Sequence, residues 1–228
     1  MIGVFDSGRG GVNTVRELRK LFKYEDIVLF CDRKSSPFGT KSREQIRDIT
    51  ENGIDLLLKR GARRVLIGCC TASTVYPLLT KEAREIAFPI ITPTVEAALN
   101  KSQKISVIAT LLTVGTGTFK KEILRLSPTA EVYEISAQDL VHSAERGEAD
   151  GNISRATSEY MESIVYKIKA CGSEALILGC THFPSFIGEL SARLEGVSVI
   201  SSTGEAATSF AKGNTELKEK GRLIYISS

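Results

Sequence analysis

The sequence predicts an α/β fold made of two similar domains, each built on a parallel β-sheet. Short runs rich in valine and isoleucine alternate with longer amphipathic stretches, as strands and helices alternate in parallel sheets. In addition, Val65–Thr71 is echoed by Leu176–Thr181, and each segment is typical of a buried strand that ends in Gly-Cys with a threonine close behind. This echo divides the chain into two repeats and therefore predicts two related domains.

The predicted strands are nearly continuous in hydrophobicity, as expected for strands buried on both faces of a sheet. They lie at Ile2–Phe5, Ile27–Cys31, Arg64–Ile67, Pro89–Ile91, Ile105–Ala109, Val132–Ile135, Ala175–Leu178 and Val197–Ile200. Helices are predicted between them at Gly11–Leu21, Arg43–Arg60, Thr74–Ile86, Val114–Leu126, Ala137–Arg146, Ser154–Cys171 and Pro184–Leu194. A last strand candidate, Leu223–Ile226, would return to the first domain.

A second echo, between Ile2–Ser7 and Ile105–Thr110, places the start of each repeat. We therefore expect a first domain of residues 1–94 plus 206–228 and a second domain of residues 95–205. Because no long linker separates them, we expect two Rossmann-like domains that face each other about a pseudo-twofold axis, with the active site in the cleft between them.

Composition excludes several classes of protein. The 228 residues carry a net charge of +3 from 30 basic and 27 acidic side chains, which are closely interspersed. Nucleic-acid binding normally needs a concentrated basic face, so no nucleic-acid partner is expected. The first residues lack the apolar stretch of a signal peptide, and no window approaches the ~18 apolar residues of a membrane span. We expect a cytoplasmic protein with no membrane partner.

The five cysteines show no spacing typical of a disulfide framework, and no Cys-x-x-Cys pair occurs. We interpret Cys31 and Cys171 as small hydrophobic residues of the interior. Cys69 and Cys180 differ, because each follows a predicted strand at the same place in its repeat. A thiol at the start of a helix has a lowered pKa, so both are candidates for a reactive role.

The carboxyl ends of parallel strands are where such sheets bind ligands. Hydroxyl groups gather at these predicted ends, and free N–H groups at helix starts suit a small anion; the hydroxyls belong to Ser7, Thr71, Ser73, Thr110, Thr113 and Thr181. Thiols on opposite faces of one carbon would remove a proton from one side and return one to the other, which inverts a stereocentre. Asp6 and His182 are the candidate helpers of the two thiols.

Five motifs in order resemble the bacterial glutamate racemases of the aspartate/glutamate racemase superfamily. They are Phe5-Asp6-Ser7-Gly8-x-Gly-Gly, Pro37-Phe38-Gly39-Thr40-Lys41-Ser42, Cys69-x-Thr71-Ala72-Ser73, Thr110-x-x-Thr113-Val114 and Gly179-Cys180-Thr181-His182-Phe183-Pro184. The resemblance implies interconversion of L- and D-glutamate without pyridoxal phosphate or a metal, supplying D-glutamate for peptidoglycan. It also implies a homodimer.

The resemblance further implies roles for individual residues. Cys69 and Cys180 would be the proton-transfer pair, with Asp6 and His182 assisting. Glu145 falls where the family often has an assisting glutamate, although a solvated acid at a helix end is an equal interpretation. Substrate contacts are implied for Ser7, Pro37, Phe38, Gly39, Cys70, Thr71, Thr113 and Thr181.

The chain departs from the family pattern at its predicted substrate contacts. Cys70 stands where the family usually has Asn, and Phe38 where Tyr is usual. Losing the partner of a buried polar group costs ~1–3 kcal/mol, enough to weaken binding or shift substrate preference. The alternatives are therefore a racemase or isomerase of the superfamily that acts on aspartate or another small acid, and a catalytically weakened binding or regulatory homologue.

Two further alternatives explain less of the sequence. A zinc site of Cys69, Cys70, Cys180 and His182 has enough ligands, but adjacent cysteines fit one tetrahedral site poorly. A Cys–His acyl-transfer enzyme would use one of the two thiols as a nucleophile and leave the repeat unexplained.

Overall fold

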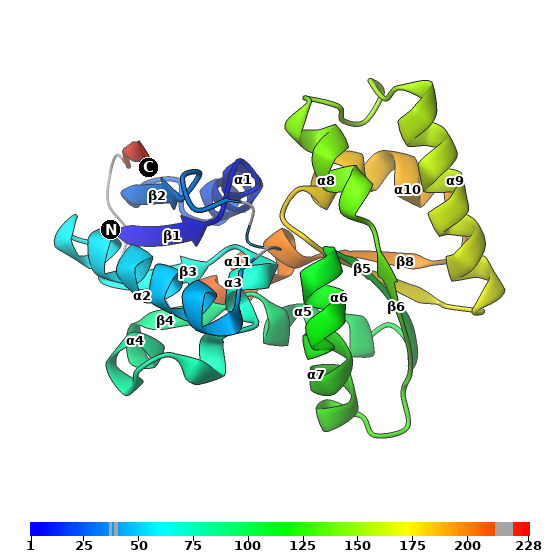
Figure 1. Cartoon of the computed structure of the whole chain (residues 1–228), viewed down its shortest axis with the longest axis horizontal. Helices are drawn as coiled ribbons and strands as arrows, with labels where there is room; N and C mark the ends of the chain where they lie inside the picture. Colours follow the sequence, from blue (N-terminus) through cyan, green and yellow to red (C-terminus); the bar gives the residue numbers. More distant parts are fainter. Residues whose placement is uncertain (37, 39–40, 213–220) are drawn as a thin grey trace. The chain divides into compact units, whose positions relative to one another are not determined.

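The chain folds into two compact units, each built around one parallel sheet (Figure 1). The computed structural model describes residues 1–36, 38, 41–212 and 221–228. One unit comprises Met1–Ile90 with Thr203–Ser228, and the other comprises Ile91–Ser202. All strand pairs within the two sheets are parallel. The predicted α/β class with parallel sheets is therefore confirmed.

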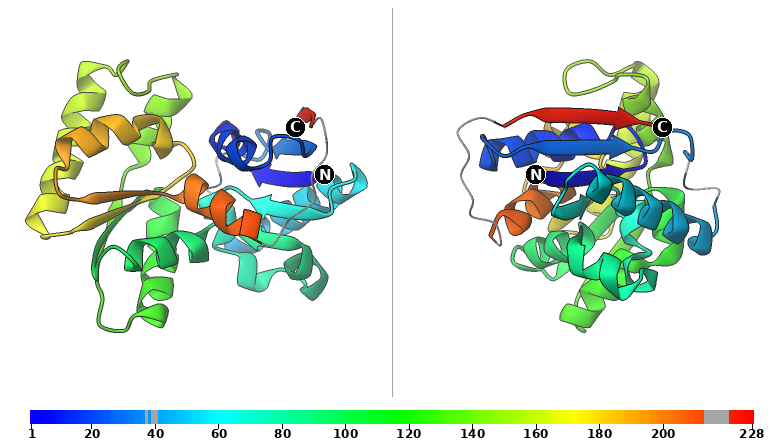
Figure 2. Two further views of the ribbon diagram at one scale, coloured as in Figure 1. Left: turned by 180° about the vertical axis from the view of Figure 1, so that it is seen from behind. Right: turned by 90° about the vertical axis from the view of Figure 1, so that its left-hand side faces the viewer.

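The first unit alternates strands with helices. In chain order its elements are β1 (Ile2–Asp6), α1 (Gly11–Leu21), β2 (Ile27–Cys31), α2 (Arg43–Lys59), β3 (Arg64–Ile67), α3 (Cys70–Ser73), η2 (Tyr76–Leu78), α4 (Lys81–Ile86), β4 (Ala87–Pro89), α11 (Ser202–Lys212, all but its first residue) and β9 (Leu223–Ser227). The strand order is β4-β3-β1-β2-β9, so β9 pairs with β2 at the edge of the sheet (Figure 2).

Helices cover both faces of this sheet. The chain crosses from β1 to β2 in one direction and from β2 to β3 in the other, so right-handed crossovers put α1 and α2 on opposite faces (Figure 2). α2 begins with a capping box between Ser42 and Gln45. It packs closely on β1 because Gly53 faces the ring of Phe5, where a Cβ would lie only 2.4 Å from a ring carbon.

α11 packs on the first unit through Phe210, which is fully buried. The ring of Phe210 makes edge contacts with Phe88 at 5.7 Å and Phe22 at 6.3 Å between ring centres. The guanidinium of Arg64 lies 4.9 Å from the centre of the same ring. These aromatic and cation–π contacts hold α11 against the sheet beside β4.

The second unit follows the same scheme. Its elements are α5 (Ile91–Leu99), β5 (Lys104–Ala109), α6 (Leu111–Thr116), α7 (Thr118–Leu126), β6 (Glu131–Ser136), α8 (Gln138–Glu145), α9 (Arg155–Ala170), β7 (Ala175–Gly179), η3 (Phe183–Phe186), α10 (Ile187–Arg193) and β8 (Ser198–Ser201). The strand order is β6-β5-β7-β8.

The two sheets share one topology. In each, the first strand of the repeat lies between the second and the third, and the fourth lies beyond the third. The order β2-β1-β3-β4 therefore matches β6-β5-β7-β8, with β9 as an addition to the first sheet. In such sheets the connections diverge between the first and third strands, and this switch point is where ligands bind.

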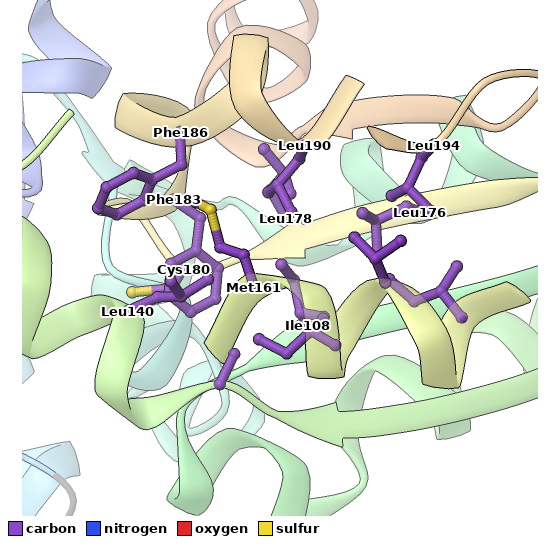
Figure 3. Packing of buried hydrophobic residues seen from close by; sticks show 14 residues of the cluster. Ile108, Leu140, Met161, Leu176, Leu178, Cys180, Phe183, Phe186, Leu190 and Leu194 are labelled. Carbon is purple, nitrogen blue, oxygen red and sulfur yellow. The ribbon is translucent and has the colours of Figure 1, made fainter. Parts of the chain in front are cut away.

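A hydrophobic cluster fills the space between one face of the second sheet and the helices α8, α9 and α10 (Figure 3). Leu176 and Leu178 from β7 meet Met161 from α9 and Leu190 from α10. Cys180, just beyond β7, borders this cluster. Its sulfur is thus placed between an apolar interior and the polar end of the strand.

Two predicted helices are interrupted. The stretch predicted as Thr74–Ile86 contains the separate elements η2 and α4, because Pro77 lacks an N–H and the Thr80 hydroxyl caps α4 by accepting the N–H of Ala83. The stretch predicted as Val114–Leu126 is divided at Gly117, whose φ of +60° ends α6 and begins α7.

The predicted strand Pro89–Ile91 is displaced toward the N-terminus. β4 ends at Pro89, the N–H of Ile90 donates to the Ser73 hydroxyl, and α5 begins at Ile91. Two further helices, α5 and α11, were not predicted from the sequence. Weak helix formers are frequent in both, with two threonines and a proline in α5 and serine, threonine and glycine in α11, so tertiary packing decides their conformation.

Among the described residues, no helix combines the length and the apolar character that crossing a bilayer requires.

Candidate active site

In both repeats a closely packed glycine precedes the cysteine, at the last position of β7 and directly after β3. A Cβ at Gly68 would lie 3.0 Å from the Thr14 hydroxyl on α1. At Gly179 it would lie 2.8 Å from the carbonyl oxygen of Ile108 on β5. These close approaches bring the backbone to the switch point, where Cys69 and Cys180 follow.

Cys69 is held by two polar groups of its own unit. It is the N-cap of α3, and the N–H of Ala72 donates to its sulfur at 3.4 Å. The Ser7 hydroxyl, just beyond β1, lies 3.2 Å from the same sulfur. The Ala72 N–H favours the thiolate, the form that accepts a proton, and the Ser7 hydroxyl can donate to the thiolate or accept from the thiol. The structure thus brings together Cys69 and Ser7, as the adjacent positions of β1 and β3 require.

Asp6 closes β1 and is fully buried. Its Oδ1 accepts the N–H of Gly8 at 2.9 Å, which forms the tight turn that leads into α1. The start of α1 packs on this turn, because a Cβ at Gly11 would lie 2.7 Å from that of Asp6. The glycine-rich segment is therefore a strand-to-helix turn that holds a carboxylate beneath the end of the sheet.

Cys31 is a buried thiol of the same region and remains protonated. Burial raises its pKa from 9.0 to about 12, and the neighbouring Asp6 carboxylate and Cys69 add to the shift. A thiol with so high a pKa is a poor nucleophile and base at neutral pH. The geometry therefore supports our interpretation of Cys31 as an interior residue.

The loop after β2 supports Ser7, a role that no sequence pattern predicted. The Ser36 hydroxyl donates to the Ser7 carbonyl, and the N–H of Asp32 donates to the Asp6 carbonyl at 2.9 Å. Asp32 Oδ1 in turn accepts the Ser228 hydroxyl at 2.7 Å. Residues almost 200 positions apart in sequence thus meet here (a separation of 196 for Asp32 and Ser228). No local motif announces such a contact.

In the second unit, Cys180, His182 and Glu145 form a connected set. Cys180 Sγ lies 3.6 Å from His182 Nδ1, and His182 Nε2 lies 2.6 Å from Glu145 Oε1. When the imidazole is neutral with its proton on Nε2, that N–H donates to Glu145 and Nδ1 accepts the thiol proton. When it is protonated, both nitrogens donate. The set can therefore exchange a proton with the sulfur while the carboxylate orients the ring.

Glu145 owes this position to α8, of which it is the last residue. Its side chain is 41% exposed, whereas that of His182 is 10% exposed. The interpretation of Glu145 as a solvated acid at a helix end and the interpretation as an assisting residue both describe part of what is seen.

The predicted hydroxyl residues divide between the two units. Thr71 is buried in α3, and Thr181 is buried beside Cys180. In α6, the Thr110 hydroxyl caps the helix and donates to the hydroxyl of the buried Thr113 at 2.9 Å. Ser73 has a structural role, because its hydroxyl donates to the Ile67 carbonyl and accepts the N–H of Ile90.

The remaining predicted contacts lie at the first sheet. Phe38 is buried, with its ring centre 6.5 Å from that of Phe5. Cys70 is the first residue of α3 and is also buried. Pro37 and Gly39 lie outside the described residues. Within the described parts of the chain, no three His, Cys, Asp or Glu side chains are grouped as a metal site would require.

Comparison with known proteins gives one consistent family. The model of the Asp/Glu/hydantoin racemase family matches residues 9–210. A glutamate racemase of Herpetosiphon aurantiacus is 33% identical over 200 residues, which cover 87% of this chain and 77% of the relative. A glutamate racemase of Deinococcus radiodurans is 31% identical over 228 residues, 98% of this chain and 76% of the relative.

Solved structures agree. Glutamate racemase of Francisella tularensis, in complex with D-glutamate, has a TM-score of 0.86 at 27% identity, covering 98% of this chain and 87% of its own. The Campylobacter jejuni glutamate racemase has a TM-score of 0.84 at 28% identity, covering 100% and 92%. Aspartate racemase of Picrophilus torridus, at 20% identity and a TM-score of 0.66 over 96% of each chain, shares the fold. The family match over most of the chain shows that this protein belongs to the Asp/Glu/hydantoin racemase family.

Proposed function

We propose that the protein interconverts L- and D-glutamate without a cofactor, by moving the α-proton between the thiols of Cys69 and Cys180. One observation carries this proposal. Each repeat sets one cysteine within two residues of the end of its third strand, at the switch point of its own sheet, and in each case a hydrogen-bonding partner lies against the sulfur. A duplicated thiol matches a reaction that needs the same kind of group twice.

The proton balance of the reaction fits two thiols. One thiolate takes the α-proton, the C–H electron pair is delocalised into the adjacent carboxylate, and the other thiol gives its proton to the opposite face of the carbon. The pair ends with its roles exchanged, ready for the reverse reaction. The proposal requires both sulfurs to reach one Cα from opposite sides.

The two thiols have different helpers. Cys69 is surrounded by the Ser7 hydroxyl and the N–H of Ala72, which suit the thiolate form. Cys180 has an imidazole that can hold its proton, and Glu145 holds that imidazole in place. We therefore propose His182 as an assisting residue, and Glu145 as a residue that acts through His182. We also propose Asp6, the buried last residue of β1, as an assisting residue.

Glutamate is the proposed substrate because the two relatives above 30% identity cited above are named glutamate racemases and one solved glutamate racemase structure contains D-glutamate. The strand-end hydroxyls and helix N–H groups suit the carboxylates of a small acid. Supplying D-glutamate for peptidoglycan is the cellular role that we propose for this activity.

Deuterium wash-in at Cα tests the proposal. Each enantiomer of glutamate and of aspartate is incubated with the protein in D₂O, and both exchange and optical rotation are followed. We expect exchange and inversion of glutamate, and slowing of inversion by about a hundredfold to ten-thousandfold in Cys69→Ser and in Cys180→Ser. Cys171→Ser serves as the control because Cys171 ends α9 just before the start of β7, whereas Cys180 follows the other end of that strand.

Unchanged inversion in either active-site variant would refute the two-thiol mechanism. Faster exchange of aspartate than of glutamate would overturn the proposed substrate. Binding of glutamate without any exchange at Cα would favour the catalytically weakened homologue instead.

A further inference from the structure

The loop between α8 and α9 begins just after Glu145, and it is hydrogen-bonded to η3, which begins just after His182. The N–H of Asp150 in this loop donates to the Ser185 carbonyl at 2.7 Å. The N–H of Ser185 donates in turn to the His182 carbonyl at 3.2 Å. A single residue, Ser185, thus connects the backbone of the loop by hydrogen bonds to the histidine that contacts Cys180.

The carboxylate of Asp150 strengthens this connection. Its Oδ2 accepts the N–H of Gly188 and its Oδ1 accepts the N–H of Glu189, both at 2.9 Å. These are N–H groups at the beginning of α10, which a carboxylate caps well. Gly188 allows the approach, because a Cβ there would lie 2.9 Å from Asp150 Oδ2.

The remainder of the loop is fixed by Glu148. Its carboxylate accepts the N–H of Ser154 at 2.8 Å and a guanidinium N–H of Arg146 at 2.9 Å. The bond from the Ser154 N–H above all, then one from the Thr157 hydroxyl and that from Arg146, lower the pKa of Glu148 to about 2. The loop is therefore anchored to the start of α9 by Glu148 and to η3 and α10 by Asp150.

We propose that Asp150 is a positioning residue, which sets the distance between Glu145 and His182 by fixing the loop after the first against the segment after the second. This inference rests on the proposed function, because the aligned pair acts on Cys180. Asp150 itself lies on the surface and caps a helix, so its effect on the reaction passes entirely through the geometry of the pair.

A pair of variants separates positioning from a simple loss of stability. Asp150→Asn removes the charge and one acceptor oxygen. Gly188→Ala keeps Asp150 but places a methyl group against its carboxylate. The single variant Asp150→Ala completes a cycle with the double variant Asp150→Ala/Gly188→Ala, in which the collision is removed. Glu195→Gln, an exposed acid of the same unit, and Gly115→Ala, whose Cβ would meet nothing within 4 Å, are the matched controls.

The first readout does not depend on turnover. NMR titration of the His182 imidazole reports its carboxylate partner, and His142 is the only other histidine of the chain. We expect the midpoint of the His182 titration to fall by several tenths of a pH unit in Asp150→Asn and in Gly188→Ala. The controls and His142 should not change, and the double variant should fall less than the sum of its single changes.

The second readout is exchange against inversion. A misaligned Cys180 side leaves proton removal by Cys69 intact, so one enantiomer should exchange its α-proton faster than it inverts. We expect inversion to slow by about tenfold, as small misplacements of catalytic groups do. Reduced stability with an unchanged His182 midpoint and an unchanged ratio of exchange to inversion would overturn the proposal. A wild-type protein that exchanges neither enantiomer would refute the proposed function, while the NMR titration would still decide the role of Asp150.

Discussion

Replacing Glu145 by glutamine should lower the midpoint of the His182 titration by ~1 pH unit. The carboxylate Oε1 lies 2.6 Å from His182 Nε2, so it stabilises the protonated imidazole. An opposite charge this close shifts a pKa by ~1–3 units. Because the Glu145 side chain is 41% exposed, we take the lower end of that range. Each pH unit corresponds to ~1.4 kcal/mol, and glutamine keeps the shape of the side chain without its charge.

Two-dimensional NMR of the imidazole resonances in the folded protein measures this change. The chain has 2 histidines, and His142 is exposed on α8, so it provides a reference within the same sample. The neighbour facing His182 on its other side is the Cys180 thiol, and the Cys180→Ser variant establishes its share. A His182 midpoint that is the same in wild type and Glu145→Gln would refute the electrostatic role that we assign to the pair.

The remaining predictions concern stability. Burial and the Asp6 carboxylate raise the pKa of Cys31 from 9.0 to about 12, so the unfolded chain loses this proton first and the free energy of unfolding should fall between these pH values, by up to ~1.4 kcal/mol per pH unit. Urea unfolding of wild type and Cys31→Ala should show this extra slope only in wild type, and equal slopes would contradict it. Gly53→Ala should destabilise by ~1–3 kcal/mol because its Cβ would collide with Phe5, despite the better helix propensity of alanine. An added Cβ at Gly115 would meet open space, so Gly115→Ala should instead raise the free energy of unfolding by ~0.4–1 kcal/mol in the same urea assay. A lower free energy of unfolding would show that the space around Gly115 is not open.

Sequence patterns predicted the strands well because buried parallel strands are continuously apolar. Val4, Leu29 and Ile177 lie in runs whose every residue is buried. The pattern failed where backbone polar groups are satisfied by distant side chains. The hydroxyl of Ser73 accepts a hydrogen bond from the N–H of Ile90, so β4 ends at Pro89. The periodicity of apolar residues cannot reveal such a contact.

The candidate site was predictable in its duplicated part. The repeated Gly-Cys reflects close packing behind Gly68 and Gly179, so a constraint of the fold marks the two thiols in the sequence. The contact between His182 and Glu145 joins residues 37 positions apart and was indicated only by the family resemblance. Asp150 carries no sequence signal, because its partners are backbone N–H groups, which any residue supplies.

The late return of β9 to the first sheet has a consequence for biosynthesis. β2 is buried along its whole length, yet its outer neighbour is made only after the second unit has been completed. Until then a nascent chain presents the hydrogen-bonding groups of Ile27–Cys31 as an open edge, to which other extended chains can add. The second unit is contiguous, so its sheet needs no strand from later in the chain. Ribosome-bound intermediates should therefore expose the edge of the first sheet. A chaperone that recognises extended apolar segments would bind there.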